Sequence, residues 1–109
     1  MYTTRVDWEP LRILDASTLG ATRLPIGGPL VHPSYKLKLV NNSNVLVTIS
    51  INGTSDVDVA PANSYWIYDE NVTSNHEGTP AGTQIYVLSS TGAPGTGNIY
   101  LVSQFLLQL

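Results

Sequence analysis

Two histidines are the first side chains to consider for catalysis or metal binding, because the chain has no cysteine. A catalytic triad needs a histidine that meets a serine and a carboxylate in space, and a thiolate metal site needs cysteine. His32 lies between Val31 and Pro33, and His76 lies in a polar stretch, so neither belongs to a recognisable motif. We therefore interpret both histidines as structural or exposed residues and expect no metal site.

Four carboxylates offer a second kind of chemistry. Asp56 and Asp58 alternate along a predicted strand, and Asp69 and Glu70 open a predicted loop. Two carboxyl groups about 5 to 10 Å apart across a cleft hydrolyse glycosidic bonds, and carboxylate clusters bind calcium. The spacing of Asp56 and Asp58 is not that of a calcium loop, and an outward strand face accounts for both. We predict no enzymatic activity and no cofactor, and keep a hydrolase built on these four residues as an alternative.

Aromatic side chains on short predicted strands are the third group that bears on function. They are Tyr65, Trp66, Tyr68, Tyr86 and Tyr100. A row of exposed rings beside polar groups stacks on sugars, whereas aromatic residues on strands otherwise fill a core or an interface. A role in the core or in an interface is favoured, and a carbohydrate-binding module that contacts a receptor remains the alternative function.

Charge is sparse and unevenly distributed along the 109 residues. Charged residues make up 12% of the chain and the net charge is −3. No lysine or arginine follows Lys38, and no charged residue occurs in the 32 positions from Gly78 to Leu109. Phosphate binding needs clustered basic residues, so nucleic acid is not an expected partner. No apolar run approaches the roughly 18 residues of a membrane helix, and no signal peptide is recognisable. The uncharged block predicts a surface that faces other protein.

The spacing of strand and breaker signals predicts an all-β fold. Period-two alternation occurs in short runs, with glycine, proline or asparagine clusters every 8 to 12 residues and no convincing helix. This pattern predicts a single antiparallel β-sandwich, jelly-roll-like, of about seven or eight short strands. We expect residues 1–21 to form an extended N-terminal arm and residues 22–109 to form the sandwich domain. Asn41–Asn44 is expected to be a turn.

The central hairpin poses a question of register. Val45–Ile51 alternates, Asn52-Gly53 signals a turn, and Asp56–Val59 returns. A two-residue turn would place Asp56 opposite Ile49 on the apolar face, which is costly for an unpaired charge. We therefore predict a loop of three or five residues, or a bulge, that puts Val57 and Val59 beside Ile49 and Val47.

Apolar residues at both ends of the chain are the expected contacts between subunits. In the arm they are Trp8, Leu11, Ile13 and Leu14, and in the C-terminal tail they are Phe105, Leu106, Leu107 and Leu109. These side chains need burial, and terminal segments stay ordered only when they dock. The polar stretch 69–82 is long enough for a contact loop, and contact with a host receptor through it is left open.

Several runs, taken together in order, resemble a family of small structural proteins of tailed bacteriophage particles. These runs are Pro10–Asp15, Pro29–Pro33, Leu39–Thr48, Ile51–Asp56, Pro61–Ser64, Ala81–Val87 and Gly97–Tyr100. The resemblance implies a non-enzymatic β-sandwich subunit that is repeated within a virion and assembled in the host cytoplasm. It implies contacts with further copies of the chain and with a larger virion protein. A head decoration or minor capsid role is favoured slightly over a neck or tail role.

Overall fold

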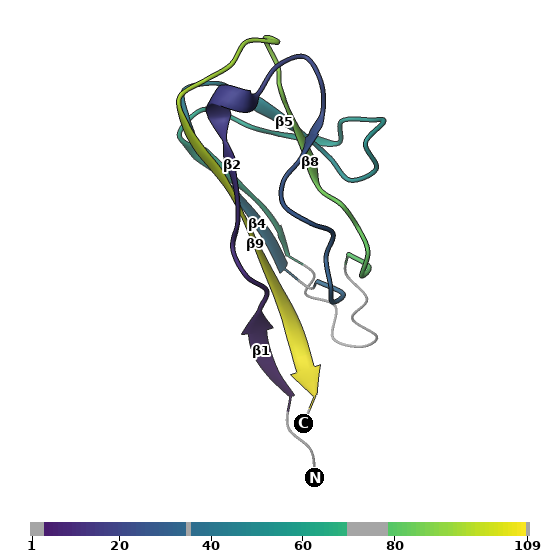
Figure 1. Ribbon diagram of the computed structural model, residues 1–109. Coiled ribbons are helices and arrows are strands. Elements are labelled where there is room, and N and C mark those ends of the chain that lie inside the picture. The colour runs from purple at the N-terminus through teal and green to yellow at the C-terminus, as the bar shows by residue number, and fades with distance from the viewer. Residues whose placement is uncertain (1–3, 35, 70–78, 109) are drawn as a thin grey trace.

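Two antiparallel sheets pack face to face as a β-sandwich in the computed structural model (Figure 1). The structure describes residues 4–34, 36–69 and 79–108. Within these residues, sheet A contains β1 (Thr4–Trp8), β2 (Arg12–Asp15), β4 (Lys36–Ser43), β7 (Ser64–Asp69) and β9 (Gly97–Gln108). Sheet B contains β3 (Leu24–Pro25), β5 (Val47–Ser50), β6 (Asp58–Ala60) and β8 (Tyr86–Ser89). The predicted all-β sandwich is confirmed, with nine strands in the described part of the chain in place of seven or eight.

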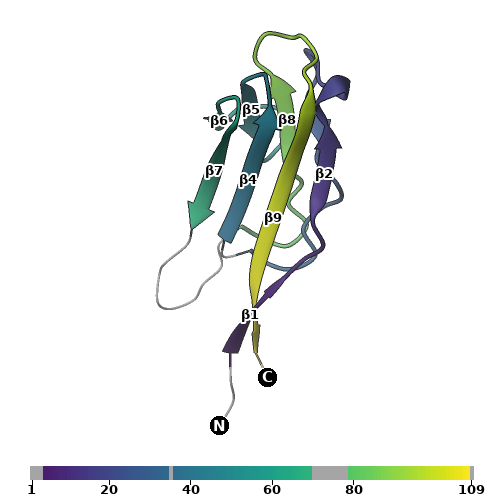
Figure 2. The same ribbon diagram turned by 90° about the vertical axis from the view of Figure 1, so that its left-hand side faces the viewer.

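The long strand β9 organises sheet A. The strand order is β1-β9-β4-β7, and β2 also pairs with β9. The first part of β9 pairs with β2 and its last part pairs with β1, so both strands lie along the same side of β9 (Figure 2). Sheet B has the order β3-β8-β5-β6. The edge strands β6 and β7 come together on one side of the sandwich (Figure 2).

The core lies between the sheets, on the inward positions of the alternating strands. In β4, for example, Leu37 and Leu39 are buried while Lys38 between them is exposed. This is the period-two pattern that a half-buried strand requires. The buried cluster contains Ala16, Leu19, Ile26, Leu30, Leu37, Leu39, Val47, Ile49, Ala60, Ile85, Val87, Ile99 and Leu101.

The segment predicted as an N-terminal arm is extended and docks on its own domain. Its strands β1 and β2 pair with β9, and a 3-10 helix, η1 (Ala16–Thr18), follows directly. Ala16 and Leu19 are fully or almost fully buried in the core cluster. The segment up to Leu19 is thus part of the sandwich, and removing it would remove core side chains.

The turn expected at Asn41–Asn44 begins later than predicted, because β4 continues to Ser43. Asn41 is completely buried, and its amide nitrogen donates to the carbonyls of Val45, Ala60 and Pro61 at 2.8, 2.9 and 3.1 Å. The Ser43 hydroxyl donates to the Asn41 side-chain oxygen. Because Ala60 belongs to β6, this amide ties sheet A to sheet B.

The predicted register of the central hairpin is wrong. Seven residues, 51–57, separate β5 from β6, so the two-residue turn is indeed absent. However, Ile49 pairs with Asp58, and Val57 and Val59 are 53% and 47% exposed. The unfavourable position of Asp58 is relieved because β6 is an edge strand, where the carboxylate accepts a 2.6 Å hydrogen bond from the indole nitrogen of Trp66 on β7.

Candidate interaction surface on the outer face of sheet A

Outward-facing residues of five strands align in rows across sheet A. One row is formed by register partners on β7, β4, β9 and β2, and consists of Tyr65, Val40, Tyr100 and Ile13. The next row contains Ile67, Lys38 and Val102, and the third contains Lys36, Gln104 and Trp8. Side chains that are directly opposite on adjacent strands lie within contact distance. The rows therefore form one continuous surface, which we call the sheet A face.

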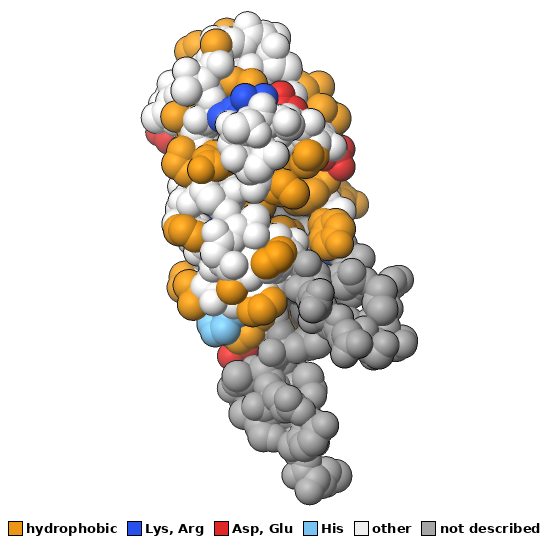
Figure 3. Space-filling model, turned by 90° about the vertical axis from the view of Figure 1, so that its right-hand side faces the viewer, with side chains coloured by type: hydrophobic (Ala, Val, Ile, Leu, Met, Phe, Trp, Pro, Cys, Tyr) orange, Lys and Arg blue, Asp and Glu red, His pale blue; other side chains and the backbone are white. Residues whose placement is uncertain are grey.

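Large apolar side chains on the sheet A face are exposed to an unusual degree. Their exposed fractions are 56% for Trp8, 56% for Ile13, 63% for Tyr65 and 43% for Ile67, and Leu11 just before β2 is 54% exposed. Single exposed apolar residues are normal, but a contiguous group of them marks an interaction site. On the face of the molecule shown in Figure 3, over sheet B, apolar side chains form separate small groups with polar atoms between them.

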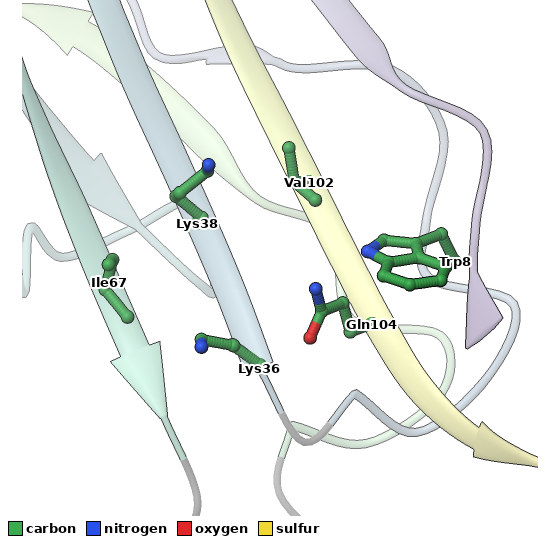
Figure 4. Close-up of a pocket in the computed structure, with 6 residues that line it drawn as sticks. All are labelled: Trp8, Lys36, Lys38, Ile67, Val102 and Gln104. Atoms are coloured by element: carbon green, nitrogen blue, oxygen red, sulfur yellow. The ribbon is translucent and has the colours of Figure 1, made fainter. Parts of the chain in front are cut away.

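A shallow hollow crosses the lower part of the sheet A face. Its volume is about 260 Å³ and it is lined by Trp8, Lys36, Lys38, Ile67, Val102 and Gln104. The ring of Trp8 stands beside β9 at one end, and the two lysines project from β4 between β9 and β7 (Figure 4). The hollow combines an aromatic ring, aliphatic side chains and two ammonium groups.

Lys38 places a positive charge in the middle of the sheet A face. The other cations with described side chains have partners: Arg12 binds Glu9, Arg23 binds Asp56, and Lys36 has a contact of its own. Lys38 is exposed between Ile67 and Val102, and forms no ion pair within the described part of the chain. A binding partner that carries an acidic group opposite Lys38 would complement this charge.

Glu9 fixes the position of β1 and of Trp8, which precedes it. The Glu9 side chain is 2% exposed and accepts a 2.8 Å hydrogen bond from Nη2 of Arg12. It also accepts bonds from the backbone nitrogens of Val31 at 3.1 Å and His32 at 2.7 Å. Arg12 in turn donates to the carbonyls of Gly28 and Pro29, both at 2.9 Å. This network, which we call the Glu9 anchor, fastens the loop before β4 to the end of β1.

The electrostatics of the Glu9 anchor favour the charged carboxylate. Burial alone would raise the pKa of Glu9, but the hydrogen bonds from Arg12 and from the backbone of His32 and Val31 together outweigh burial. The pKa of Glu9 therefore lies below its ordinary value of 4.5. The ring of His32 stacks on Phe105 with 3.8 Å between ring centroids and adds an apolar contact at the same corner.

The predicted subunit contacts fall into three groups in the structure. Trp8, Leu11 and Ile13 are exposed on or beside the sheet A face, as a contact residue should be. Leu14 packs against the core, and Phe105 is only 7% exposed beneath His32, so these two side chains are already covered within the chain. The backbones of Leu106 and Leu107 continue β9 opposite β1, and Leu109 lies outside the described residues.

The residues considered for catalysis do not come together within the described part of the chain. Asp56 is engaged with Arg23 at 3.0 Å and Asp58 with Trp66 at 2.6 Å. Glu70 and His76 lie outside the described residues, and so does most of the 69–82 loop. Among the described residues, no group of three or more histidine, cysteine or acidic side chains is placed to bind a metal ion.

The aromatic residues do not form the single row that sugar stacking requires. Tyr65 and Tyr100 lie on the sheet A face, whereas Trp66 and Tyr68 point to the other side of β7. There they line a groove of about 480 Å³ between the sheets, together with Leu37, Ile51, Val57 and Pro80. Trp66 also packs against the core, so its ring is not a free platform.

The sequence indicated Tyr65 only as one of several aromatic residues for a core or an interface, and it did not identify Ile67 or Lys38 as members of the surface. The alternation Lys36–Leu39 was a usable signal, because it identifies the outward positions of β4, and Tyr65 and Ile67 stand beside these positions on β7. Finding the neighbours required the strand register, which is not local information.

Comparisons with protein families, with curated proteins and with solved structures found no match for this chain. Within the described ranges, no helix has the length and apolar character needed to cross a membrane.

Proposed function

We propose that this protein is a non-enzymatic structural subunit of a tailed bacteriophage particle, repeated within the virion and docked on a larger virion protein. The observation that carries the proposal is the sheet A face, where Trp8, Leu11 and Ile13 are each more than half exposed. Isolated soluble domains rarely expose a contiguous apolar group of this kind, and structural subunits bury such faces against neighbours. The order of motifs that resembles the phage family points to the same role.

The location in the particle follows the same reasoning. A subunit that decorates a capsid or joins its parts needs an exposed docking face, and the sheet A face offers one. We favour head decoration or a minor capsid role over a neck or tail role. Lys38 adds a specific requirement, because the docking surface should place a carboxylate opposite it within an apolar setting.

A test replaces the two apolar residues next to the hollow, in the variant Leu11→Ser/Ile13→Ser. Both side chains are exposed, so the sandwich should fold, while the docking face loses its apolar character. The matched control is Val57→Ser/Val59→Ser, which changes two equally exposed residues on the β6 edge. Mass spectrometry of purified particles should show loss of the first variant and full occupancy of the second. Full occupancy of both variants would refute the proposed docking face.

A carbohydrate-binding role remains the second candidate, and the observation that favours it is Trp8. Its ring is 56% exposed and borders the hollow that also contains Gln104 and Lys36. An aromatic ring beside polar groups is suited to stack on a sugar. Binding of the purified protein to a glycan array, abolished by Trp8→Ala, would favour this candidate over the structural role.

A further inference from the structure

The strand β1 forms a projecting ribbon with the end of β9. The pairing of β4 with β9 ends at Lys36 and Gln104, whereas β1 continues to pair with β9 as far as Gln108. The ribbon extends beyond the body of the sandwich, and β1 is the terminal strand of its sheet (Figures 1 and 2). A two-stranded ribbon is marginal by itself, and a terminal strand presents unpaired backbone groups to a further strand.

The hydrogen-bond phase of β1 identifies which residues face the open edge. The backbone nitrogen of Glu9 donates to the carbonyl of Ser103 on β9 at 3.1 Å. Backbone groups in an antiparallel pair alternate between the two sides of a strand, so Asp7 and Arg5 also direct theirs toward β9. Thr4, Val6 and Trp8 therefore direct their N–H and C=O groups toward the open edge. The nitrogen of Trp8 donates to the Asp7 carboxylate at 2.9 Å and not to β9, so pairing with a further strand would exchange this bond for one to the partner strand.

The sequence of β1 is self-complementary about Val6. In an antiparallel pair of two β1 strands with Val6 on the two-fold axis, each residue five meets a residue seven. Arg5 of one copy then stands opposite Asp7 of the second copy, and the same pair occurs again on the other side of the axis. Thr4 stands opposite Trp8. Val6 directs its backbone groups toward the open edge, so it can exchange both of its backbone hydrogen bonds with Val6 of the second copy across the axis.

We propose that two copies of this chain associate by antiparallel pairing of their β1 strands across Val6. The occupant of the open edge is thus a second copy, and charge complementarity is the argument for it. Opposite charges directly across a strand pair stabilise it, whereas like charges destabilise it. A two-fold contact of this kind is closed, because the same strand serves both partners. The inference rests on the proposed function only for its place in a virion. It adds to that function the way in which repeated copies contact one another.

The outward faces of the two copies would also continue into one another. Val6 is 38% exposed and Trp8 is 56% exposed, and both belong to the face of β1 that continues the sheet A face. Pairing places Val6 beside Val6 and joins the two apolar faces into a single surface. Charged residues on a terminal strand also discourage random pairing. Here they would permit only the register that brings Arg5 and Asp7 together.

Charge exchange on the full-length chain tests this register. Sedimentation equilibrium over a concentration series should show a mass that rises from 11.8 kDa toward twice that value. The variants Arg5→Asp and Asp7→Arg should each remain monomeric, because each brings like charges together across the two-fold axis. An equimolar mixture of the two variants should restore the dimer, because every cross-strand pair is then opposite in sign. The double variant Arg5→Asp/Asp7→Arg should dimerise alone.

The mixture separates the proposal from effects within one chain. A pairing of residues five and seven inside a single β1 strand is lost in both single variants and is not recovered by mixing them. A wild-type protein that stays monomeric at every concentration overturns the proposal. A dimer that persists in both single variants overturns it as well. The docking proposal is judged separately by Leu11→Ser/Ile13→Ser, which leaves β1 unchanged, so the failure of one proposal is distinguishable from the failure of the other.

Discussion

Among the acidic residues whose side chains the structure describes, Glu9 should be the one whose replacement by the corresponding amide weakens the fold most. The Glu9 side chain is 2% exposed and that of Arg12 is 10% exposed, with 2.8 Å between Nη2 and Oε1. Removing one partner of a buried ion pair costs about 3–5 kcal/mol. Arg12 keeps its bonds to the carbonyls of Gly28 and Pro29, so the lower end applies. We expect Glu9→Gln to lower the free energy of unfolding by about 3 kcal/mol.

Urea unfolding at neutral pH measures this loss. A domain of this size has a free energy of unfolding of about 5–15 kcal/mol, so the variant should still fold. Its urea midpoint should fall by about 1–3 M, given typical denaturant slopes. The control is Asp56→Asn, because the pair between Asp56 and Arg23 is exposed on the surface, with side chains 34% and 29% exposed. That exchange should cost less than about 1 kcal/mol.

The pH dependence gives a second, independent measurement. The folded pKa of Glu9 lies below its ordinary value of 4.5, so the unfolded chain takes up the proton first on acidification. The stability that Glu9 contributes is therefore fully present above that ordinary value and is lost as the pH falls through the folded pKa. The difference between wild type and Glu9→Gln should shrink between pH 6 and pH 3. A variant as stable as Asp56→Asn, or a difference that does not shrink in acid, would refute the role assigned to the Glu9 anchor.

Two further exchanges test how the sheets and turns are held together. Asn41→Leu removes the amide donor of the carbonyls of Val45, Ala60 and Pro61, of which Val45 keeps a bond from the Ser43 hydroxyl. It should lower the free energy of unfolding in urea by about 3 kcal/mol, whereas Asn42→Ala on the exposed side of β4 should change it little. Gly97→Ala should prevent folding or lower the melting temperature by more than 10 °C. Gly97 has φ of +103°, and an added Cβ would lie 2.1 Å from the Asn42 carbonyl oxygen. Gly28→Ala is its control, since no atom lies within 4 Å of the added Cβ, and an equal loss in both variants would contradict this account.

Local alternation was sufficient to predict the strands but not all of their ends. Lys36–Leu39 alternates charged and apolar residues, and β4 places them outward and inward as expected. Asn41 and Ser43 were assigned to a turn because such side chains favour turns. In the fold, the Asn41 amide donates to the carbonyl of Ala60 on the opposite sheet and to those of Val45 and Pro61 beside it, and the partners 19 and 20 residues away override the local preference.

The central hairpin is a second case in which a contact between distant residues decided what the local sequence could not. The prediction assumed that Val57 and Val59 must be buried and that Asp58 must not face the same way as Ile49. The structure resolves the conflict differently, because Trp66 on the neighbouring edge strand supplies a donor for Asp58. A sequence pattern cannot reveal that two sheet edges meet at this point, and so it cannot assign the register that depends on the meeting.

The candidate surface was predicted in part because exposed apolar residues near a terminus are visible in the sequence. Trp8, Leu11 and Ile13 were identified by type alone, whereas Tyr65 joined them only when β7 was placed beside β4. Phe105 was included for the same reason of type, yet it is covered by His32. Residue type therefore identified side chains that need burial, and only the fold distinguished those already buried from those left exposed.

Trp8 connects the two surfaces on which the proposals rest. It lies on the sheet A face and, as the last residue of β1, it also lies at the edge where a second copy would pair. The Glu9 anchor directly after it holds both in one orientation, so pairing at β1 would set two sheet A faces side by side rather than against each other. A large flat partner would then meet both faces at once, and the second contact would form at a high effective concentration. Association of the copies through β1 and docking through the sheet A face should therefore reinforce each other, whereas a dimer formed through the sheet A face would cover the surface that docking needs.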